Sequence, residues 1–257
     1  MAGKDEGSEE DSEMMELLYR LARKLKRSNF PGHGLINLMY YDPETIVLHP
    51  KNLDYVVVDG CKFFVSDQID SIQRVRGNPW FANVRETDTV VDIGANIGAI
   101  CIPLAQTAKR VLAIEPLFSR ELSDNIQLNG MKHIIVLKVG IGDWATSQMF
   151  EFGPRQGMAP CMPFAKISPT LGFPIDFLKM DCEGCEWSIQ PEEMQGIREL
   201  RIEFHMRRGH KREDTAAFEK WKQWLDDNNY TYTISRMKIP PCVPFYDYFL
   251  LNASRRE

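Results

Sequence analysis

The chain lacks the features that mark membrane and secreted proteins. No uninterrupted apolar run approaches the roughly 20 residues that a membrane-spanning helix requires. The N-terminus is acidic and polar, whereas a secretory signal peptide has a basic start and an apolar centre. These absences predict a cytoplasmic protein without a transmembrane segment. The length of 257 residues suits one large α/β domain with a short appendage.

A general excess of positive charge is also missing. The formal net charge is −5, and residues 1–13 account for all of it with six acids and one base, Lys4. The rest of the chain is formally neutral and therefore lacks the positive field of a dedicated nucleic-acid-binding protein. We expect residues 1–13 to be a disordered acidic tail.

Cysteines are few and do not have the spacing of a disulfide-rich or zinc-binding domain. Cys182 and Cys185 form a C-x-x-C pair, but no second pair stands at the distance that a structural zinc site needs. We therefore expect reduced cysteines throughout the chain. The six are Cys61, Cys101, Cys161, Cys182, Cys185 and Cys242.

Hydrophobic periodicity divides the chain into an appendage, residues 14–87, and a domain, residues 88–257. In the appendage, residues 14–27 and 67–76 have helical character, and Asp59-Gly60 joins two short apolar runs as in a β-hairpin. In the domain, apolar strands alternate with helices, which predicts a mostly parallel sheet covered on both faces. The expected strands are 89–93, 110–114, 134–139, 176–180, 198–204, 230–234 and 246–251, and the expected helices are 99–108, 117–129 and 215–227. Residues 153–174 are rich in Gly and Pro and are expected to be irregular.

The first domain strand ends in the loop VVDIGANIG. Asp92 ends the strand, and Gly94 and Gly98 bracket a tight turn that contains Ala95 and Asn96. A nicotinamide-binding loop would need glycine in place of Asn96, where the backbone approaches a pyrophosphate. The glycines would let the backbone pass close to a ligand. The pattern favours a ligand without pyrophosphate whose amino group lies near a carboxylate, as in S-adenosylmethionine.

The next two strand ends carry acids of the type that bind a nucleoside. Glu115 follows Asp92 by 23 residues, close to the roughly 20-residue offset at which an acid accepts hydrogen bonds from ribose hydroxyls. Gly142-Asp143 follows the third strand, and the carboxylate of Asp143 could accept from the exocyclic amine of adenine.

The last strand ends supply groups that could take a proton. FLKMDCEGCEW contains Asp181, Glu183 and Glu186, and IEFH contains Glu203 and His205. Asp181, Glu183 and His205 are candidate general bases, with Asp181 also beside the cofactor. For His205 a structural hydrogen-bonding role stays open, and for Glu186 an exposed position. Three acids without a neighbouring Asn or His make a weak metal site, so we predict no metal.

The run VVDIGANIG, IEP, NIQLNG, GIGD and FLKMDCEGCEW resembles the FkbM-type family of S-adenosylmethionine-dependent methyltransferases. The resemblance covers about residues 54–205 and implies a Rossmann-like class I fold with a seven-stranded sheet. It also implies O-methylation of a hydroxyl group. The family's T-L-D-x-L stretch is replaced here by ISPTLGFPIDF, which leaves the substrate open. By motif, the methionine part would contact Asp92, Gly94, Asn96 and Gly98, the ribose Glu115, and the adenine Asp143.

The expected acceptor is a hydroxyl on a small molecule, sugar or lipid. An anionic acceptor is a further hypothesis, because a basic run follows the fifth strand. An RNA (tRNA) base methyltransferase remains the alternative enzyme, and a non-catalytic S-adenosylmethionine-binding protein the alternative of another class. The basic run comprises Arg207, Arg208, His210, Lys211 and Arg212.

Overall fold

The computed structural model describes residues 47–48, 55–64, 72, 79–142, 147–152, 155–207, 212–236 and 246–256. The chain divides into two compact units, Met1–Arg76 and Gly77–Glu257. The expected acidic tail, the helix over residues 14–27 and all but one residue of the helix over 67–76 lie outside the described residues.

The described part of the first unit is a three-stranded antiparallel sheet in the order β1-β2-β3. Its strands are β1 (Val47–Leu48), β2 (Tyr55–Val58) and β3 (Cys61–Phe64). Asp59 and Gly60 join β2 to β3 with φ angles of 46° and 77°. Positive φ at both central residues is what a two-residue hairpin turn of this twist requires, so the predicted hairpin is confirmed.

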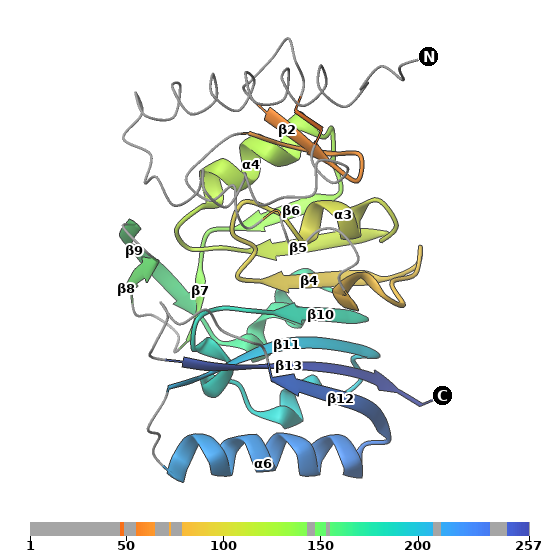
Figure 1. Ribbon diagram of the computed structural model, residues 1–257, viewed down its shortest axis with the longest axis vertical. Coiled ribbons are helices and arrows are strands. Elements are labelled where there is room, and N and C mark those ends of the chain that lie inside the picture. The colour runs from red at the N-terminus through yellow and green to blue at the C-terminus, as the bar shows by residue number, and fades with distance from the viewer. Residues whose placement is uncertain are drawn as a thin grey trace, which may run out of the picture. The chain divides into compact units, whose positions relative to one another are not determined.

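A seven-stranded sheet forms the centre of the second unit (Figure 1). Its strand order is β12-β13-β11-β10-β4-β5-β6. Strand β13 runs in the direction opposite to that of the other six strands. Every residue of the central strands β4 and β10 is buried, which explains why both read as apolar runs. The predicted, mostly parallel α/β sheet is confirmed. The strands are β4 (Thr89–Ile93), β5 (Arg110–Ile114), β6 (Ile134–Leu137), β10 (Phe177–Met180), β11 (Glu199–Arg207), β12 (Tyr230–Arg236) and β13 (Tyr246–Arg255).

Helices α3 and α4 lie within their predicted ranges with shorter ends, whereas α6 begins before the predicted residue 215 and α5 was not predicted. Helix α3 begins only at Cys101, because the residues before it belong to the glycine turn after β4. Helix α4 ends at Leu128, and Gly130 follows with a φ of 66°, as expected for a glycine just beyond a helix. Among the described residues, no helix combines the length and apolar character needed to cross a membrane. The helices are α3 (Cys101–Ala105), α4 (Ser119–Leu128), α5 (Ile167–Leu171) and α6 (Arg212–Asp227).

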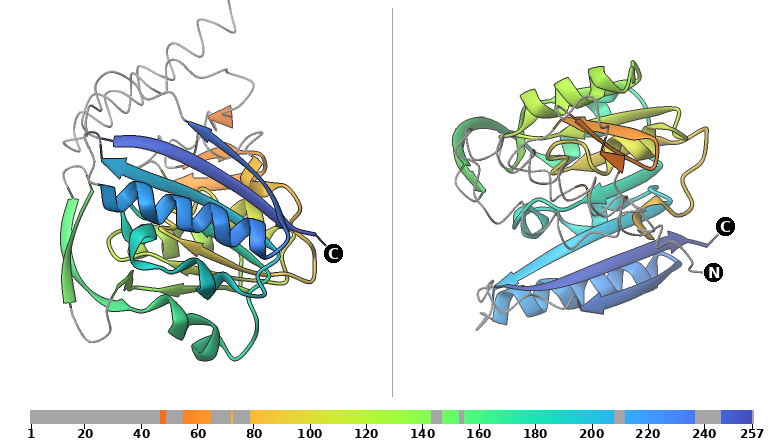
Figure 2. Two further views of the ribbon diagram at one scale, coloured as in Figure 1. Left: turned by 90° about the horizontal axis from the view of Figure 1, so that it is seen from below. Right: turned by 45° about the horizontal axis from the view of Figure 1, so that its top comes forward.

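The prediction of an irregular segment over residues 153–174 is wrong. Strands β8 (Ser147–Phe152) and β9 (Arg155–Met162) pair antiparallel, and β9 also pairs with β7 (Gly140–Ile141). The two strands pair through backbone hydrogen bonds despite their Gly and Pro content. Pro160, which has no N–H to donate, lies in the first residue pair of this ladder, opposite Ser147. Figures 1 and 2 show this hairpin beyond the carboxyl ends of the parallel strands.

Candidate cofactor and active site

The glycine turn after β4 has the backbone conformation that its sequence predicts. Gly94, Asn96 and Gly98 have φ angles of 72°, 50° and 95°. The amides of Gly94 and Ala95 donate to the carbonyl of Ile114, at 2.9 and 3.2 Å. The turn is thereby fixed to the carboxyl end of β5.

The two glycines are needed for contacts within the protein. A Cβ at position 94 would lie 1.8 Å from the carbonyl oxygen of Asp181, and one at 98 would lie 2.7 Å from Cδ1 of Ile102 and 2.9 Å from Cδ1 of Leu122. Besides the predicted close approach to a ligand, the glycines therefore allow close packing of the turn against the end of β10 and against helices α3 and α4. In this way the glycines bring the turn next to Asp181.

A buried ion pair lies beneath this turn. Asp92 is fully buried, and its Oδ1 lies 2.9 Å from Nζ of Lys179, which is also buried. The same ammonium group donates to the carbonyl oxygens of Gly94, at 2.9 Å, and Ile93, at 3.3 Å. Burial raises the pKa of Asp92, and the charge of Lys179 opposes that rise. Sequence reasoning missed Lys179, although a lysine inside the apolar strand FLKM signals a buried partner of opposite charge.

Glu115 lies directly after β5, where three backbone amides position its carboxylate. Oε2 accepts from the amide of Asn96 at 2.8 Å, and Oε1 accepts from those of Leu117 and Phe118 at 2.7 and 3.1 Å. Burial raises the pKa of Glu115, and these hydrogen bonds oppose the rise. A carboxylate has about four acceptor sites, so this one retains capacity for a ligand hydroxyl. Its position beside the glycine turn fits the predicted contact with a ribose.

The predicted adenine contact is only partly described. Asp143 lies outside the described residues. Gly142 is described, and its amide donates to the carbonyl of Met162 at 3.1 Å, where β9 runs beside β7. The basic residues 208–211 also lie outside the described residues.

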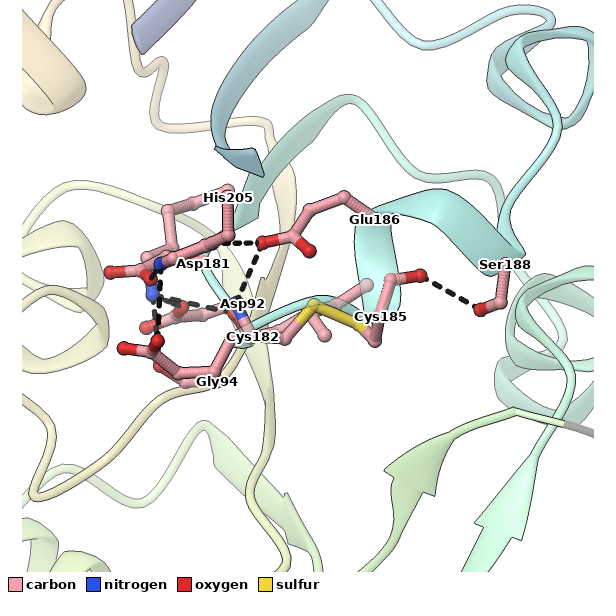
Figure 3. Close-up of a disulfide and its surroundings, with 11 residues drawn as sticks. Asp92, Gly94, Asp181, Cys182, Cys185, Glu186, Ser188 and His205 are labelled. Carbon is pink, nitrogen blue, oxygen red and sulfur yellow. Dashed lines mark hydrogen bonds and ion pairs between the residues drawn. A yellow bond between two sulfur atoms is a disulfide. The ribbon is translucent and has the colours of Figure 1, made fainter. Parts of the chain in front are cut away.

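The structure brings Asp181, Glu183 and His205 together. Strands β10 and β11 are parallel neighbours, with Met180 in register with Ile202, so their carboxyl ends reach the same edge of the sheet. Nε2 of His205 lies 3.6 Å from Oδ1 of Asp181 and 3.4 Å from Oε2 of Glu183. Figure 3 shows Asp181 and His205 next to each other near Gly94, so the candidate bases are adjacent to the glycine turn.

Glu186 holds the other nitrogen of this histidine. Its Oε1 lies 2.5 Å from Nδ1 of His205, and its side chain is fully buried, so the alternative of an exposed position is wrong. Burial alone would lower the pKa of His205, but the bond to Glu186 and the charges of Glu186, Glu183 and Asp181 outweigh it and raise that pKa to about 9. The histidine is therefore held in its protonated form near neutral pH.

Cys182 and Cys185 form a disulfide within the loop that carries the carboxylates (Figure 3). The expectation that they are reduced is wrong. Glu183 and Gly184, which lie between the two cysteines, have positive φ angles of 58° and 119°. The two Cα atoms lie 5.5 Å apart, a usual distance for a disulfide. Cysteine spacing alone does not reveal such local folding. Among the described cysteines, Cys61, Cys101 and Cys161 are free and buried.

Comparison with known proteins places this geometry in a family. The Methyltransferase FkbM domain matches residues 92–232, more than half of the chain. A curated relative, probable ribosomal RNA small subunit methyltransferase A of Methanothermobacter thermautotrophicus, is 38% identical over 69 residues, which are 26% of this chain and 25% of the relative. The chain thus spans about a quarter of the length of the curated relative that it matches.

Two solved structures illustrate the structural similarity. An rRNA methylase from Streptococcus thermophilus has a TM-score of 0.46 and 12% identity, over 69% of this chain and 93% of that chain. TYW2 of M. jannaschii, solved in complex with AdoMet, has a TM-score of 0.44 and 18% identity, over 84% and 89%. The family match covers the glycine turn, Glu115 and the carboxylate loop, and the sheet around them is mostly parallel. The chain belongs to the FkbM methyltransferase family.

Proposed function

We propose that the enzyme methylates a hydroxyl group on a small molecule, a sugar or a lipid. The observation that carries this proposal is the group of Asp181, Glu183 and His205 at the sheet edge that also holds the glycine turn. S-Adenosylmethionine supplies an activated methyl group, so the protein has to place the acceptor and take up its proton. A hydroxyl acceptor needs such a proton acceptor within hydrogen-bonding reach.

Asp181 is the proposed general base. Its side chain is 12% exposed, its backbone amide donates to the carbonyl of Ile93 at 3.1 Å, and this fixes it beside the glycine turn. His205 is the proposed positioning residue, because Glu186 holds its Nδ1 and its Nε2 lies 3.6 Å from Oδ1 of Asp181. Glu183 is 44% exposed, so it is suited to pass the proton to solvent.

The proposed cofactor contacts follow the order of the strand ends. The turn after β4 lies against Glu115 on one side and against Asp181 on the other. This arrangement supports a methionine part held by the turn, a ribose at Glu115 and an adenine beside β7. The proposed residues are Asp92, Gly94, Ala95, Asn96, Gly98, Glu115, Gly142, Asp143 and Asp181.

Replacing Glu115 with Gln is expected to weaken S-adenosylmethionine binding by about 10- to 100-fold. A hydrogen bond to a charged group contributes about 1.5–3 kcal/mol, and a neutral amide lacks the charge and one of the two accepting oxygens. Calorimetric titration of the variant with S-adenosylmethionine measures the change. Glu121→Gln, which alters a helix carboxylate paired with Arg155, is the control and should bind normally.

A 2′-deoxy analogue of S-adenosylhomocysteine separates direct contact from an effect on the turn. The wild type should bind this analogue more weakly than S-adenosylhomocysteine itself, whereas Glu115→Gln should bind the two equally. An undiminished preference for the ribose form in the variant would mean that Glu115 only supports the backbone amide of Asn96.

RNA is the second candidate acceptor, because the curated relative is described as a ribosomal RNA methyltransferase. The carboxylates of Asp181, Glu183 and Glu186 lie together at the proposed site, and Glu203 has its Oε1 3.7 Å from His205. This concentration of acids disfavours a polyanionic acceptor. Outside residues 1–13 the chain is formally neutral, so it also lacks the positive field that attracts RNA.

Methyl transfer to fractionated cell extract tests the acceptor class. The protein is incubated with S-adenosylmethionine labelled on the methyl group and with separate small-molecule, lipid and RNA fractions. We expect label in the small-molecule or lipid fraction, in a form that resists ribonuclease. Label confined to RNA and released by ribonuclease would overturn the hydroxyl proposal in favour of the RNA candidate.

A further inference from the structure

We infer that Asp181, Glu183 and His205 form a binding site for one divalent metal ion of the manganese or zinc type. Each residue offers one donor atom, and the three atoms lie within 4.8 Å of one another. No metal is expected from the sequence, because the acids of the loop after β10 have no histidine beside them. Parallel pairing of β10 with β11 adds His205 to that loop.

The distances from the histidine nitrogen to the two carboxylates suit a shared ion. Imidazole nitrogen and carboxylate oxygen bind zinc at about 2.0–2.2 Å, so two donors of one ion stand about 2.8–3.6 Å apart at angles between 90° and tetrahedral. Nε2 of His205 is 3.4 Å from Oε2 of Glu183 and 3.6 Å from Oδ1 of Asp181. An ion can therefore bind between the histidine and each carboxylate with little movement of these side chains. The ion would replace the proton on Nε2 of His205, so binding releases that proton.

The hydrogen bonds that hold His205 are also those of a metal-binding histidine. Metal-binding histidines usually donate their second ring N–H to a carboxylate, which fixes the tautomer and the orientation of the ring. Nδ1 of His205 makes this bond to Oε1 of Glu186 at 2.5 Å, and both side chains are buried. Nε2 is thereby directed towards Asp181 and Glu183. The carbonyl of His205, in turn, accepts a hydrogen bond from Nε1 of Trp187 at 2.9 Å.

The site has a buried side and an open side. His205 is almost wholly buried, whereas Glu183 is 44% exposed. Three protein donors leave coordination positions for water or another ligand, as in catalytic rather than structural metal sites. A metal ion bound there would lower the pKa of a hydroxyl that it binds, which would assist a hydroxyl acceptor. Binding of the ion does not require that acceptor, so the two proposals can fail separately.

The donor set favours one class of ion. Imidazole nitrogen suits zinc and iron, and carboxylate oxygen suits manganese and magnesium. A mixed set of one nitrogen and two oxygens therefore favours Mn²⁺ or Zn²⁺ over Mg²⁺ and Ca²⁺, which bind mainly through oxygen.

Titration with Mn²⁺, followed by electron paramagnetic resonance, tests the site in the full chain with its disulfide intact. The signal of free Mn²⁺ disappears on binding, and we expect one ion per chain, displaced by Zn²⁺ at lower concentration than by Mg²⁺. Glu183→Gln should raise the Kd for Mn²⁺ at least tenfold. Glu192→Gln is the matched control, because Glu192 is an exposed carboxylate, 57% accessible, on a neighbouring turn, and it should leave the Kd unchanged.

His205→Gln is the second variant and should also lose the bound ion. Since Glu183 is exposed, its variant stays folded even if the histidine variant does not, and circular dichroism checks both. Absence of binding to the wild type, or equal Kd values for the wild type and Glu183→Gln, would overturn the site. The second result would assign the ion to other acids, such as those of residues 1–13.

Discussion

Replacing Lys179 with Met is expected to lower the free energy of unfolding by about 3–5 kcal/mol, as measured by urea denaturation. Removal of one member of a buried ion pair leaves the other charge in the core without compensation. Nζ of Lys179 is 2.9 Å from Oδ1 of Asp92, and neither side chain has appreciable contact with water. The variant also loses the hydrogen bond to the carbonyl oxygen of Gly94, so the glycine turn loses part of its support.

The double variant Lys179→Met with Asp92→Leu is the control for this result. It removes both charges, so it should be clearly more stable than Lys179→Met alone. If the two variants were equally unstable, the loss would come from packing of the lysine stem, for example against Trp80, whose ring centre lies 5.4 Å from Nζ.

The loss of unfolding free energy caused by Lys179→Met is also expected to grow as the pH rises. Burial already raises the pKa of Asp92, and loss of the lysine removes the charge that opposes this rise. The folded variant then binds a proton that the unfolded chain releases, so its stability decreases as pH rises above the unfolded-state pKa of Asp92. Denaturation at several pH values should show the smallest difference from the wild type in acid.

Replacing Gly94 with Ala is expected to cost about 2–5 kcal/mol of stability and to weaken S-adenosylmethionine binding. A left-handed backbone costs a residue with a Cβ about 1–2 kcal/mol, and forcing extra atoms into a packed region typically costs about 1–3 kcal/mol. Here the new Cβ would stand 1.8 Å from the carbonyl oxygen of Asp181, so the turn and the end of β10 must separate. Chemical denaturation and calorimetry measure the two effects.

Gly130→Ala is the matched control for the steric part. Gly130 has a similar φ of 66°, but a Cβ added there would have no described atom within 4 Å. We expect Gly130→Ala to lose only the conformational contribution and to bind the cofactor normally. Equal losses of stability in the two variants would show that the contact between the turn and Asp181 contributes nothing to stability.

The sequence predicted the parts of the fold that depend on local pattern. Buried parallel strands read as apolar runs, so the predicted bounds 89–93 and 110–114 coincide with β4 and β5. The turn of Asp59 and Gly60 follows from their tolerance of positive φ. The hairpin of β8 and β9 was not predictable in this way, because its stability comes from pairing between strands and not from composition.

The candidate site, like the fold, could be predicted from the sequence only in part. The sequence alone determined which residue types follow each strand, and so identified Asp92, Glu115 and Asp181 as candidates. Only the tertiary structure decided that Lys179 neutralises Asp92 and that Glu186 orients His205. These contacts depend on the register between neighbouring strands and on the folding of the loop after β10, which residue spacing does not encode. For this reason the enzyme class follows from sequence motifs, whereas the arrangement of charges around the reacting groups does not.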